Sequence, residues 1–207
     1  MTAADTGLRE LTAAQRGIWY AQQLAPDDTV LNVAEYLEID GGADPRLFAR
    51  AVRAAVADVD AYRLRFTVAD GEPRQYTEPA ADVPVQLVDV SAEPEPRAAA
   101  EAWMRTELRR PVDPRSGPLF ALAVLVVSDD TLFWYHRAHH LILDGHGGAL
   151  IAARVADAYS ALLTGGRYTA EAPEPSTVLV DAEHAYRASP DRERDRAFWL
   201  DTLAGAS

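Results

Sequence analysis

The sequence contains no cysteine, which excludes disulfide bonds, thiolate metal ligands and a cysteine nucleophile. It also lacks long apolar runs, and none approaches the roughly 18 consecutive apolar residues that indicate a transmembrane helix. Basic residues are few, since 20 Lys and Arg stand against 32 Asp and Glu and leave a net charge of −12. A general nucleic-acid-binding or anionic-membrane-binding surface is therefore disfavoured.

Several catalytic signatures are missing as well. The chain has no Gly-x-Ser-x-Gly nucleophile elbow, no P-loop and no dinucleotide-binding fingerprint. Residues 1–10 lack the basic and apolar regions of a signal peptide, so we expect a cytoplasmic protein. Acid–base chemistry without a covalent intermediate is the class of reaction that remains.

The composition is that of a folded protein, with 48% hydrophobic and 25% charged residues among 207. Hydrophobic periodicity, capping residues and turn residues predict an alternation of helices and strands without a regular βαβ period. This alternation favours an α/β fold with a mixed-sheet sandwich over a doubly wound parallel sheet. Helices are predicted at 13–24, 45–56, 98–108 and 148–163 and after Ser176 and Ser189, and strands at 30–39, 62–67, 75–77, 83–90, 119–127 and 131–139.

The stretch from His139 to Gly145, His-His-Leu-Ile-Leu-Asp-Gly, is the strongest candidate site. It follows an apolar strand and precedes a long apolar helix. Adjacent side chains at a strand end point to opposite faces, so one histidine would act while the other supports it. The same geometry disfavours a metal site. Two structural histidines at a turn are the alternative interpretation, but the glycines at 145, 147 and 148 favour close approach of a ligand.

These seven residues resemble the HHxxxDG signature of condensation domains from nonribosomal peptide synthetases, within the wider chloramphenicol-acetyltransferase-like acyltransferases. Residues 12–19, TAAQRGIW, resemble the opening motif SxAQxRLW of that family, with Gly17 where arginine is common. Residues 58–66 resemble the motif RHExLRTxF, although the leading Arg-His-Glu is replaced. Residues 196–200 resemble the segment that closes the N-terminal lobe of the family.

The resemblance implies a chloramphenicol-acetyltransferase-like fold and only half of a domain. Condensation domains are pseudo-dimers of two related lobes with the active site in a tunnel between them. We therefore expect residues 1–207 to form the N-terminal subdomain of a condensation domain, with the C-terminal lobe absent. We expect the isolated lobe to be inactive.

The resemblance also implies the chemistry. The family joins a donor acyl or peptidyl thioester to the amine of an acceptor aminoacyl thioester. The implied partners are upstream and downstream peptidyl carrier domains and the C-terminal condensation lobe. Substrates arrive on phosphopantetheine arms, and no cofactor or metal is bound directly.

The family's residues carry over position by position. His140 becomes the catalytic residue, acting as a general base or as a hydrogen-bond acceptor that positions the amine. Histidine side chains titrate near pH 6.5, which suits proton transfer at neutral pH. His139, Asp144, Gly145 and Arg63 would support the active-site loop. Asp144 would form an ion pair with Arg63, and Gly145 would leave room for substrate or offer a backbone N–H.

Other interpretations remain open. A free-standing acyltransferase that uses coenzyme A would share the signature, and a noncatalytic lobe would only dock carrier proteins. Epimerisation and heterocyclisation are disfavoured, the first by Gly145 and the second by the presence of histidines where that subgroup has aspartates. His136 and His146 receive no role from the resemblance and are interpreted as structural or solvated side chains.

Overall fold

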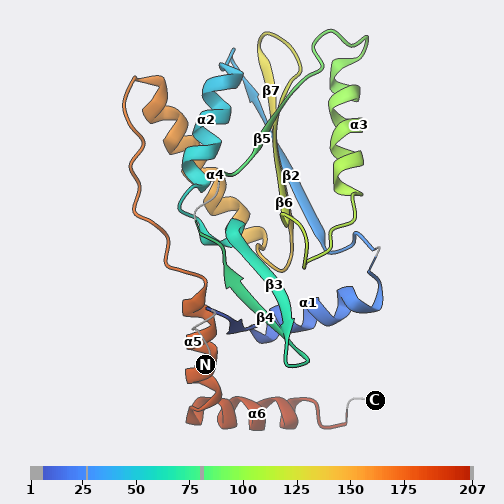
Figure 1. Cartoon of the computed structure of the whole chain (residues 1–207), viewed down its shortest axis with the longest axis vertical. Coiled ribbons are helices and arrows are strands. Elements are labelled where there is room, and N and C mark those ends of the chain that lie inside the picture. The colour runs from blue at the N-terminus through green and yellow to red at the C-terminus, as the bar shows by residue number, and fades with distance from the viewer. Residues whose placement is uncertain (1–6, 27, 80–81, 206–207) are drawn as a thin grey trace, which may run out of the picture.

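A four-stranded mixed sheet forms the centre of the molecule (Figure 1). The structure is a computed structural model and describes residues 7–26, 28–79 and 82–205. The central strand β7 pairs antiparallel with both β2 and β6, and β5 pairs parallel with β6. The strands, in their order across the sheet, are β2 (Asn32–Asp40), β7 (Thr131–His139), β6 (Phe120–Val126) and β5 (Val85–Asp89).

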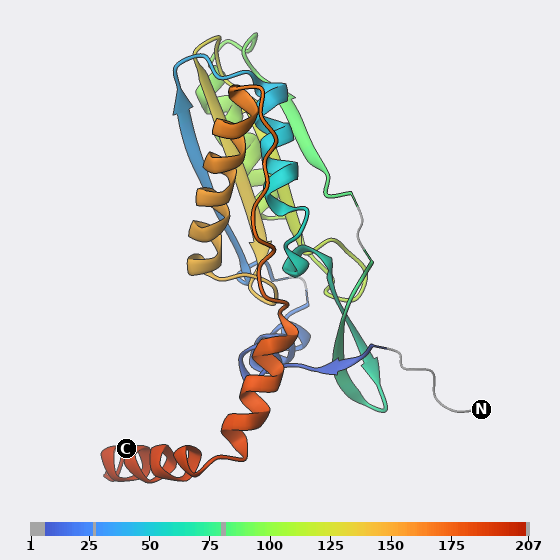
Figure 2. The same cartoon turned by 90° about the vertical axis from the view of Figure 1, so that its left-hand side faces the viewer.

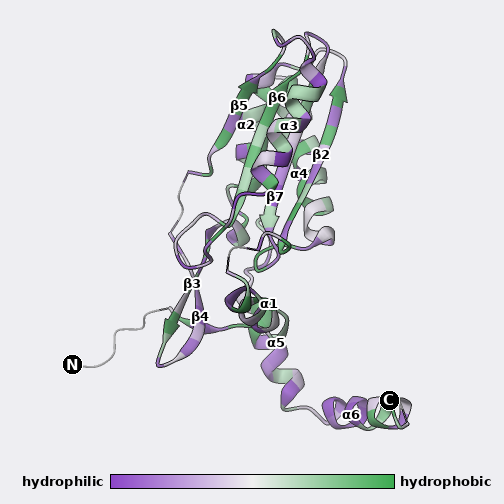
Figure 3. Cartoon of the chain, turned by 90° about the vertical axis from the view of Figure 1, so that its right-hand side faces the viewer, coloured by the Kyte–Doolittle hydropathy of each residue, from purple (hydrophilic) through white to green (hydrophobic). Residues whose placement is uncertain are grey.

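Helices cover both faces of this sheet, which confirms the predicted mixed-sheet α/β sandwich. Helices α2 (Pro45–Val56) and α4 (Gly145–Leu163) pack against each other on one face, and α3 (Pro96–Leu108) covers the other (Figure 1). Strand β6 is apolar along its whole length, as a strand between two helical layers should be (Figure 3).

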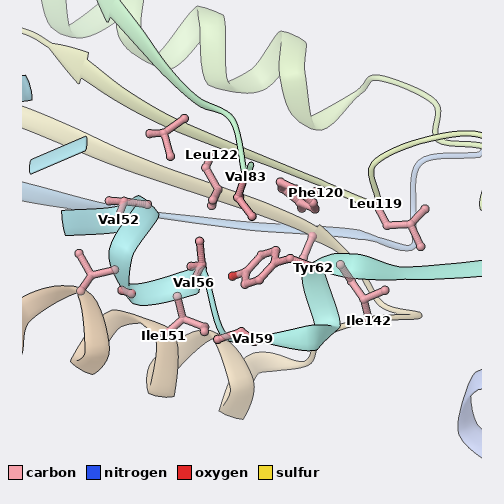
Figure 4. Close-up of a cluster of buried hydrophobic side chains, with 14 of the residues drawn as sticks. Val52, Val56, Val59, Tyr62, Val83, Leu119, Phe120, Leu122, Ile142 and Ile151 are labelled. Carbon is pink, nitrogen blue, oxygen red and sulfur yellow. The ribbon is translucent and has the colours of Figure 1, made fainter. Parts of the chain in front are cut away.

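Apolar side chains from the sheet, α2 and α4 fill the main core. Figure 4 shows Tyr62 packed among valines of α2 and side chains at the start of β6. The Tyr62 ring meets Phe120 edge-on, with 5.0 Å between ring centroids. Asp44 caps α2 as predicted, because its carboxylate accepts the backbone N–H groups of Arg46 and Leu47.

A small antiparallel sheet lies at one end of the body (Figure 1). It consists of β1 (Arg9–Glu10), β4 (Glu72–Thr77) and β3 (Leu64–Ala69), and α1 (Ala13–Leu24) follows β1. Asp70 and Gly71 form the predicted hairpin turn with φ angles of 53° and 80°. Thr12 and Gln15 form the predicted capping box of α1.

The strand predicted over 62–67 begins too early. Residues Asp60–Arg63 form a short 3₁₀ helix, and β3 starts at Leu64. The alternating pattern was misleading because Tyr62 is buried in the main core rather than on a sheet face.

The last two helices, α5 (Thr177–Arg187) and α6 (Pro190–Thr202), extend away from the body (Figure 2). No residue of α6 is buried, and Phe198, Trp199, Leu200 and Leu203 are all more than half exposed. Among the described residues, no helix is long and apolar enough to span a membrane.

Candidate active site

The end of β7 places three side chains on one face of the sheet. His136, Ala138 and His140 alternate with residues of the opposite face, as the period of a strand requires. Pairing continues past the strand end, where the backbone N–H of His140 donates to the carbonyl of Leu31 at 2.9 Å. The backbone of His140 is therefore held by the residue that precedes the edge strand β2 as well as by its connection to β7.

His140 lines a pocket of about 280 Å³ between the end of the sheet and the start of α4. We call this the His140 pocket. Its walls are mostly small and apolar, and its polar groups are two imidazoles and two carboxylates. The lining residues are Val33, Ala34, Glu35, His136, Ala138, His140, Leu143, Asp144, Gly145 and Gly148.

His139 points to the opposite face and is only 1% exposed. Its Nδ1 accepts the backbone N–H of Leu141 at 3.1 Å, so the proton of the neutral ring lies on Nε2, which donates to Oε1 of Gln22 at 3.1 Å. Burial lowers the pKa of His139 to about 4, and nearby positive charge adds to the effect. The two adjacent histidines thus face different surroundings, as the strand geometry predicted.

Asp144 does not form the predicted ion pair with Arg63. Among the described residues, no ion pair joins these two side chains. Asp144 is exposed and instead caps α4, because its Oδ1 accepts the N–H of Gly147 at 2.8 Å. Arg63 lies at the end of the 3₁₀ helix, and its Nε is buried without a hydrogen-bond partner in the described part of the chain.

Helix α4 starts earlier than the sequence pattern predicted. The helix begins at Gly145 rather than at the predicted residue 148, because the Asp144 carboxylate satisfies an N–H group of the first turn. A Cβ at Gly145 would meet no atom within 4 Å, so the space beside this residue is open. The backbone N–H of Gly145 belongs to the first turn, where N–H groups have no partner within the helix.

Two residues of the pocket were missed as site residues. Nε2 of His136 lies 3.1 Å from the hydroxyl of Tyr62, and Nδ1 lies 3.6 Å from Oε1 of Glu35. Burial lowers the pKa of His136 to about 4, which keeps the ring neutral. The even, four-residue spacing of His136 and His140 along β7 and its extension was the signal for His136, because it places both side chains on one face. Glu35 could not be found in this way, because its position depends on the register of β2 against β7.

A glutamine pair holds the site loop to α1. Gln15 donates to the carbonyl of Leu141 at 3.2 Å and exchanges hydrogen bonds with the buried Gln75 of β4. Gln15 belongs to the opening motif, so this motif is linked to the His-His stretch through the loop backbone. Among the described residues, no group of three or more His, Asp or Glu side chains is placed to hold a metal ion.

Comparison with known proteins gives one consistent family. The family model for the condensation domain matches residues 6–207. The dimodular nonribosomal peptide synthase of Bacillus subtilis (strain 168) is 41% identical over 196 residues, which cover 95% of this chain and 8% of that protein. Enterobactin synthase component F of Escherichia coli O157:H7 is 36% identical over 194 residues, which cover 92% of this chain and 15% of that protein.

Solved structures agree with these sequence relatives. The starter condensation domain of rhizomide synthetase superposes with a TM-score of 0.87 at 39% identity, covering 97% of this chain and 48% of that one. The first condensation domain of the calcium-dependent antibiotic synthetase gives a TM-score of 0.88 at 31% identity, with 97% and 48% covered. The chain therefore spans about half the length of these solved domains.

Proposed function

The chain belongs to the condensation-domain family of nonribosomal peptide synthetases, and on that premise we propose that residues 1–207 are the N-terminal lobe of such a domain. The lobe contributes His140 to amide bond formation. The reaction joins a donor acyl or peptidyl thioester to the amine of an acceptor aminoacyl thioester, and each substrate is borne on the phosphopantetheine arm of a carrier protein.

The position of His140 carries this proposal. Of the two adjacent imidazoles, only that of His140 lines the pocket, while His139 is buried and engaged on both nitrogens. No side-chain hydrogen bond of His140 occurs within the described ranges, so its ring nitrogens remain available to a substrate. A free imidazole at a pocket wall fits a group that accepts a proton or a hydrogen bond from an amine.

The chemistry follows from the two thioesters. The acceptor nitrogen attacks the donor carbonyl, the C–N bond forms, and the C–S bond breaks to release the phosphopantetheine thiol. His140 accepts the proton that the nitrogen loses, or it orients the amine while proximity supplies most of the acceleration. Gly145 supports the site by leaving open space beside the first turn of α4, and its N–H suits a developing oxyanion.

A second lobe is required to complete the site. The pocket is open on this chain, and large apolar side chains are exposed at the end of α6, three on the helix and one at Leu203 directly after it. Exposed apolar groups gathered on one element indicate a surface that another protein surface covers. The C-terminal lobe would cover such surfaces and close the tunnel, and carrier domains would approach the completed domain.

The test compares the complete domain with this chain alone. We expect the complete domain to form an amide between carrier-bound donor and acceptor, and this chain alone to form none. In the complete domain, His140→Ala should reduce the rate by about 10²- to 10⁴-fold, the range for a positioned acid–base group. His146→Ala is the matched control, because His146 is exposed and does not line the pocket.

Two outcomes would contradict the proposal. Amide formation by residues 1–207 alone would show that no second lobe is needed. An unchanged rate for His140→Ala, in a domain whose folding is intact, would remove His140 from the chemistry.

A further inference from the structure

Glu35 lies where two pockets meet at the edge of the main sheet. The first is the His140 pocket, on the α4 side of β2. The second, which we call the α3 pocket, has a volume of about 360 Å³ and lies between β2 and α3. Ala34 and Glu35 line both. Because β2 is an edge strand, Glu35 borders the pockets on both of its sides.

A short row of polar side chains leads from the core to the Glu35 carboxylate. The Tyr62 hydroxyl lies 3.1 Å from Nε2 of His136, and Nδ1 of His136 lies 3.6 Å from Oε1 of Glu35. Burial raises the pKa of Tyr62, so its hydroxyl stays protonated and donates to Nε2. The proton of the neutral His136 ring is then on Nδ1, where it faces Glu35.

Gly148 makes room for this carboxylate. A Cβ on residue 148 would come within 2.7 Å of Oε1 of Glu35, closer than such atoms approach. Without that side chain, the carboxylate rests against the first turns of α4, where the helix dipole favours negative charge. The Glu35 carboxylate therefore lies between His136 of β7 and Gly148 of α4.

The charges around Glu35 favour a cationic ligand. The His140 pocket contains two carboxylates and no Lys or Arg, and the Asp144 carboxylate is engaged with the N–H of Gly147. In the α3 pocket, Glu101 and Arg105 form an ion pair at 3.3 Å, and Tyr135 adds a phenol. With His136 neutral, Glu35 presents an uncompensated negative charge beside His140.

We propose that Glu35 binds the α-ammonium group of the acceptor aminoacyl thioester and presents it to His140. The inference rests on the proposed function and names the group that the site recognises. Free α-amino groups titrate near pH 8, so most acceptor molecules carry this charge at neutral pH. The bound ammonium loses one proton to water, the neutral amine attacks the thioester carbonyl, His140 accepts the second proton as the C–N bond forms, and the departing thiolate takes that proton from His140.

The experiment measures amide formation by the complete domain with the natural donor loaded and the acceptor carrier supplied at varied concentration. Glu35→Gln keeps the shape and a hydrogen-bonding group but removes the charge. We expect KM for the acceptor carrier to rise by about 10- to 100-fold, the range for a hydrogen bond to a charged group, with a much smaller change in kcat. Glu38→Gln is the matched control, because Glu38 lies on the same strand, pairs with Arg97 and lines neither pocket.

A second variant moves the carboxylate without removing it. In Gly148→Ala the new methyl group displaces Oε1 of Glu35, so KM should rise in the same direction and by less. Alanine favours a helix more than glycine does, so loss of folding does not explain such a rise.

Measuring KM for the acceptor carrier over a range of pH distinguishes binding of the ammonium charge by Glu35 from a structural role of Glu35. The wild-type KM should rise above pH 8 as the acceptor amine loses its charge, and Glu35→Gln should lose this dependence. The other ionisable groups that line the two pockets are present in both proteins, namely His136, His140, Asp144, Tyr36, Glu101, Arg105 and Tyr135.

The outcomes distinguish the two proposals. If wild-type domain forms no amide, the proposed function fails and the role of Glu35 fails with it. If wild-type domain is active and Glu35→Gln keeps both its KM and its pH dependence, only the role of Glu35 is overturned. A fall in kcat alone, with KM unchanged, would also overturn it, because that result assigns Glu35 to structure around His136.

Discussion

Both faces of β7 present histidine side chains near the end of the strand, but the surroundings of the two faces differ. On the α3 face, Arg137 and His139 are 3% and 1% exposed, and each is engaged by a neighbouring polar side chain. On the α4 face, His136 and His140 line an open pocket. The adjacent residues His139 and His140 therefore differ in their surroundings, because the strand geometry turns the first toward Gln22 and the second toward the pocket.

The difference arises from what covers each face. Helix α3 supplies the buried Glu107 to Arg137, and α1 supplies the buried Gln22 to His139. On the other face, α4 begins only at Gly145, and its first turn has glycine at 145, 147 and 148. Small side chains at that point leave the pocket unfilled. The α3 face is thus expected to govern stability, and the α4 face to govern activity.

The largest expected effect lies on the α3 face. Glu107→Ala removes the carboxylate that accepts a hydrogen bond from Nη2 of Arg137 at 3.2 Å. The buried guanidinium of Arg137 then loses its ion-pair partner. We expect a loss of about 3–5 kcal/mol in unfolding free energy, measured by urea denaturation. Glu101→Ala, on the same helix but in an exposed pair with Arg105, should cost less than about 1 kcal/mol.

A double variant sharpens this result. Glu107→Met with Arg137→Met removes both charges, so it should recover much of the stability that the single change loses. A single Glu107→Ala variant as stable as Glu101→Ala would show that the pair does not stabilise the α3 face.

Acid should destabilise the protein through its buried histidines. Burial lowers the pKa of His136 and of His139 to about 4, whereas both titrate near 6.5 in the unfolded chain. As the pH falls below 6.5, the unfolded state binds protons that the folded state does not, so stability decreases until about pH 4. Between pH 7 and pH 5 each histidine should account for about 2 kcal/mol of that loss.

The matched variant is His139→Gln, which keeps a hydrogen-bonding side chain and removes the titration. Urea denaturation at pH 7 and pH 5 should show a smaller loss for the variant than for the wild type. Equal losses would mean that His139 titrates alike in the folded and unfolded states.

Much of the framework was predictable from local patterns. The capping box at Thr12 and Gln15, the Asp44 cap and the strand over 131–139 all depend on residues close in sequence, and all are confirmed. The opposite orientation of His139 and His140 follows from strand geometry alone. By contrast, Glu35, Gln22 and Gln75 reach the site from other elements, and single-sequence periodicity does not reveal strand register or helix placement.

Replacing Asp144 should lower the unfolding free energy by less than the predicted ion pair with Arg63 implied. An ion pair with Arg63, if buried, would make its loss costly, whereas an exposed helix cap contributes about 1 kcal/mol. We therefore expect Asp144→Ala to cost about 1 kcal/mol in urea denaturation. Asp144→Ser, which retains a capping oxygen, should restore most of the stability. A loss of several kcal/mol in both variants would indicate a role for the carboxylate charge beyond capping.

The smallest expected effect on stability belongs to His140. Its ring faces the pocket and forms no side-chain hydrogen bond within the described part of the chain, so His140→Ala should change the unfolding free energy by less than about 0.5 kcal/mol. His139→Ala, one residue away, loses two hydrogen bonds and leaves a cavity, and it should cost about 3 kcal/mol. Measured together by urea denaturation, the two variants test the contrast between the faces directly. Similar losses would mean that His140 also serves the fold, and a low rate for His140→Ala in the complete domain would then no longer separate chemistry from folding.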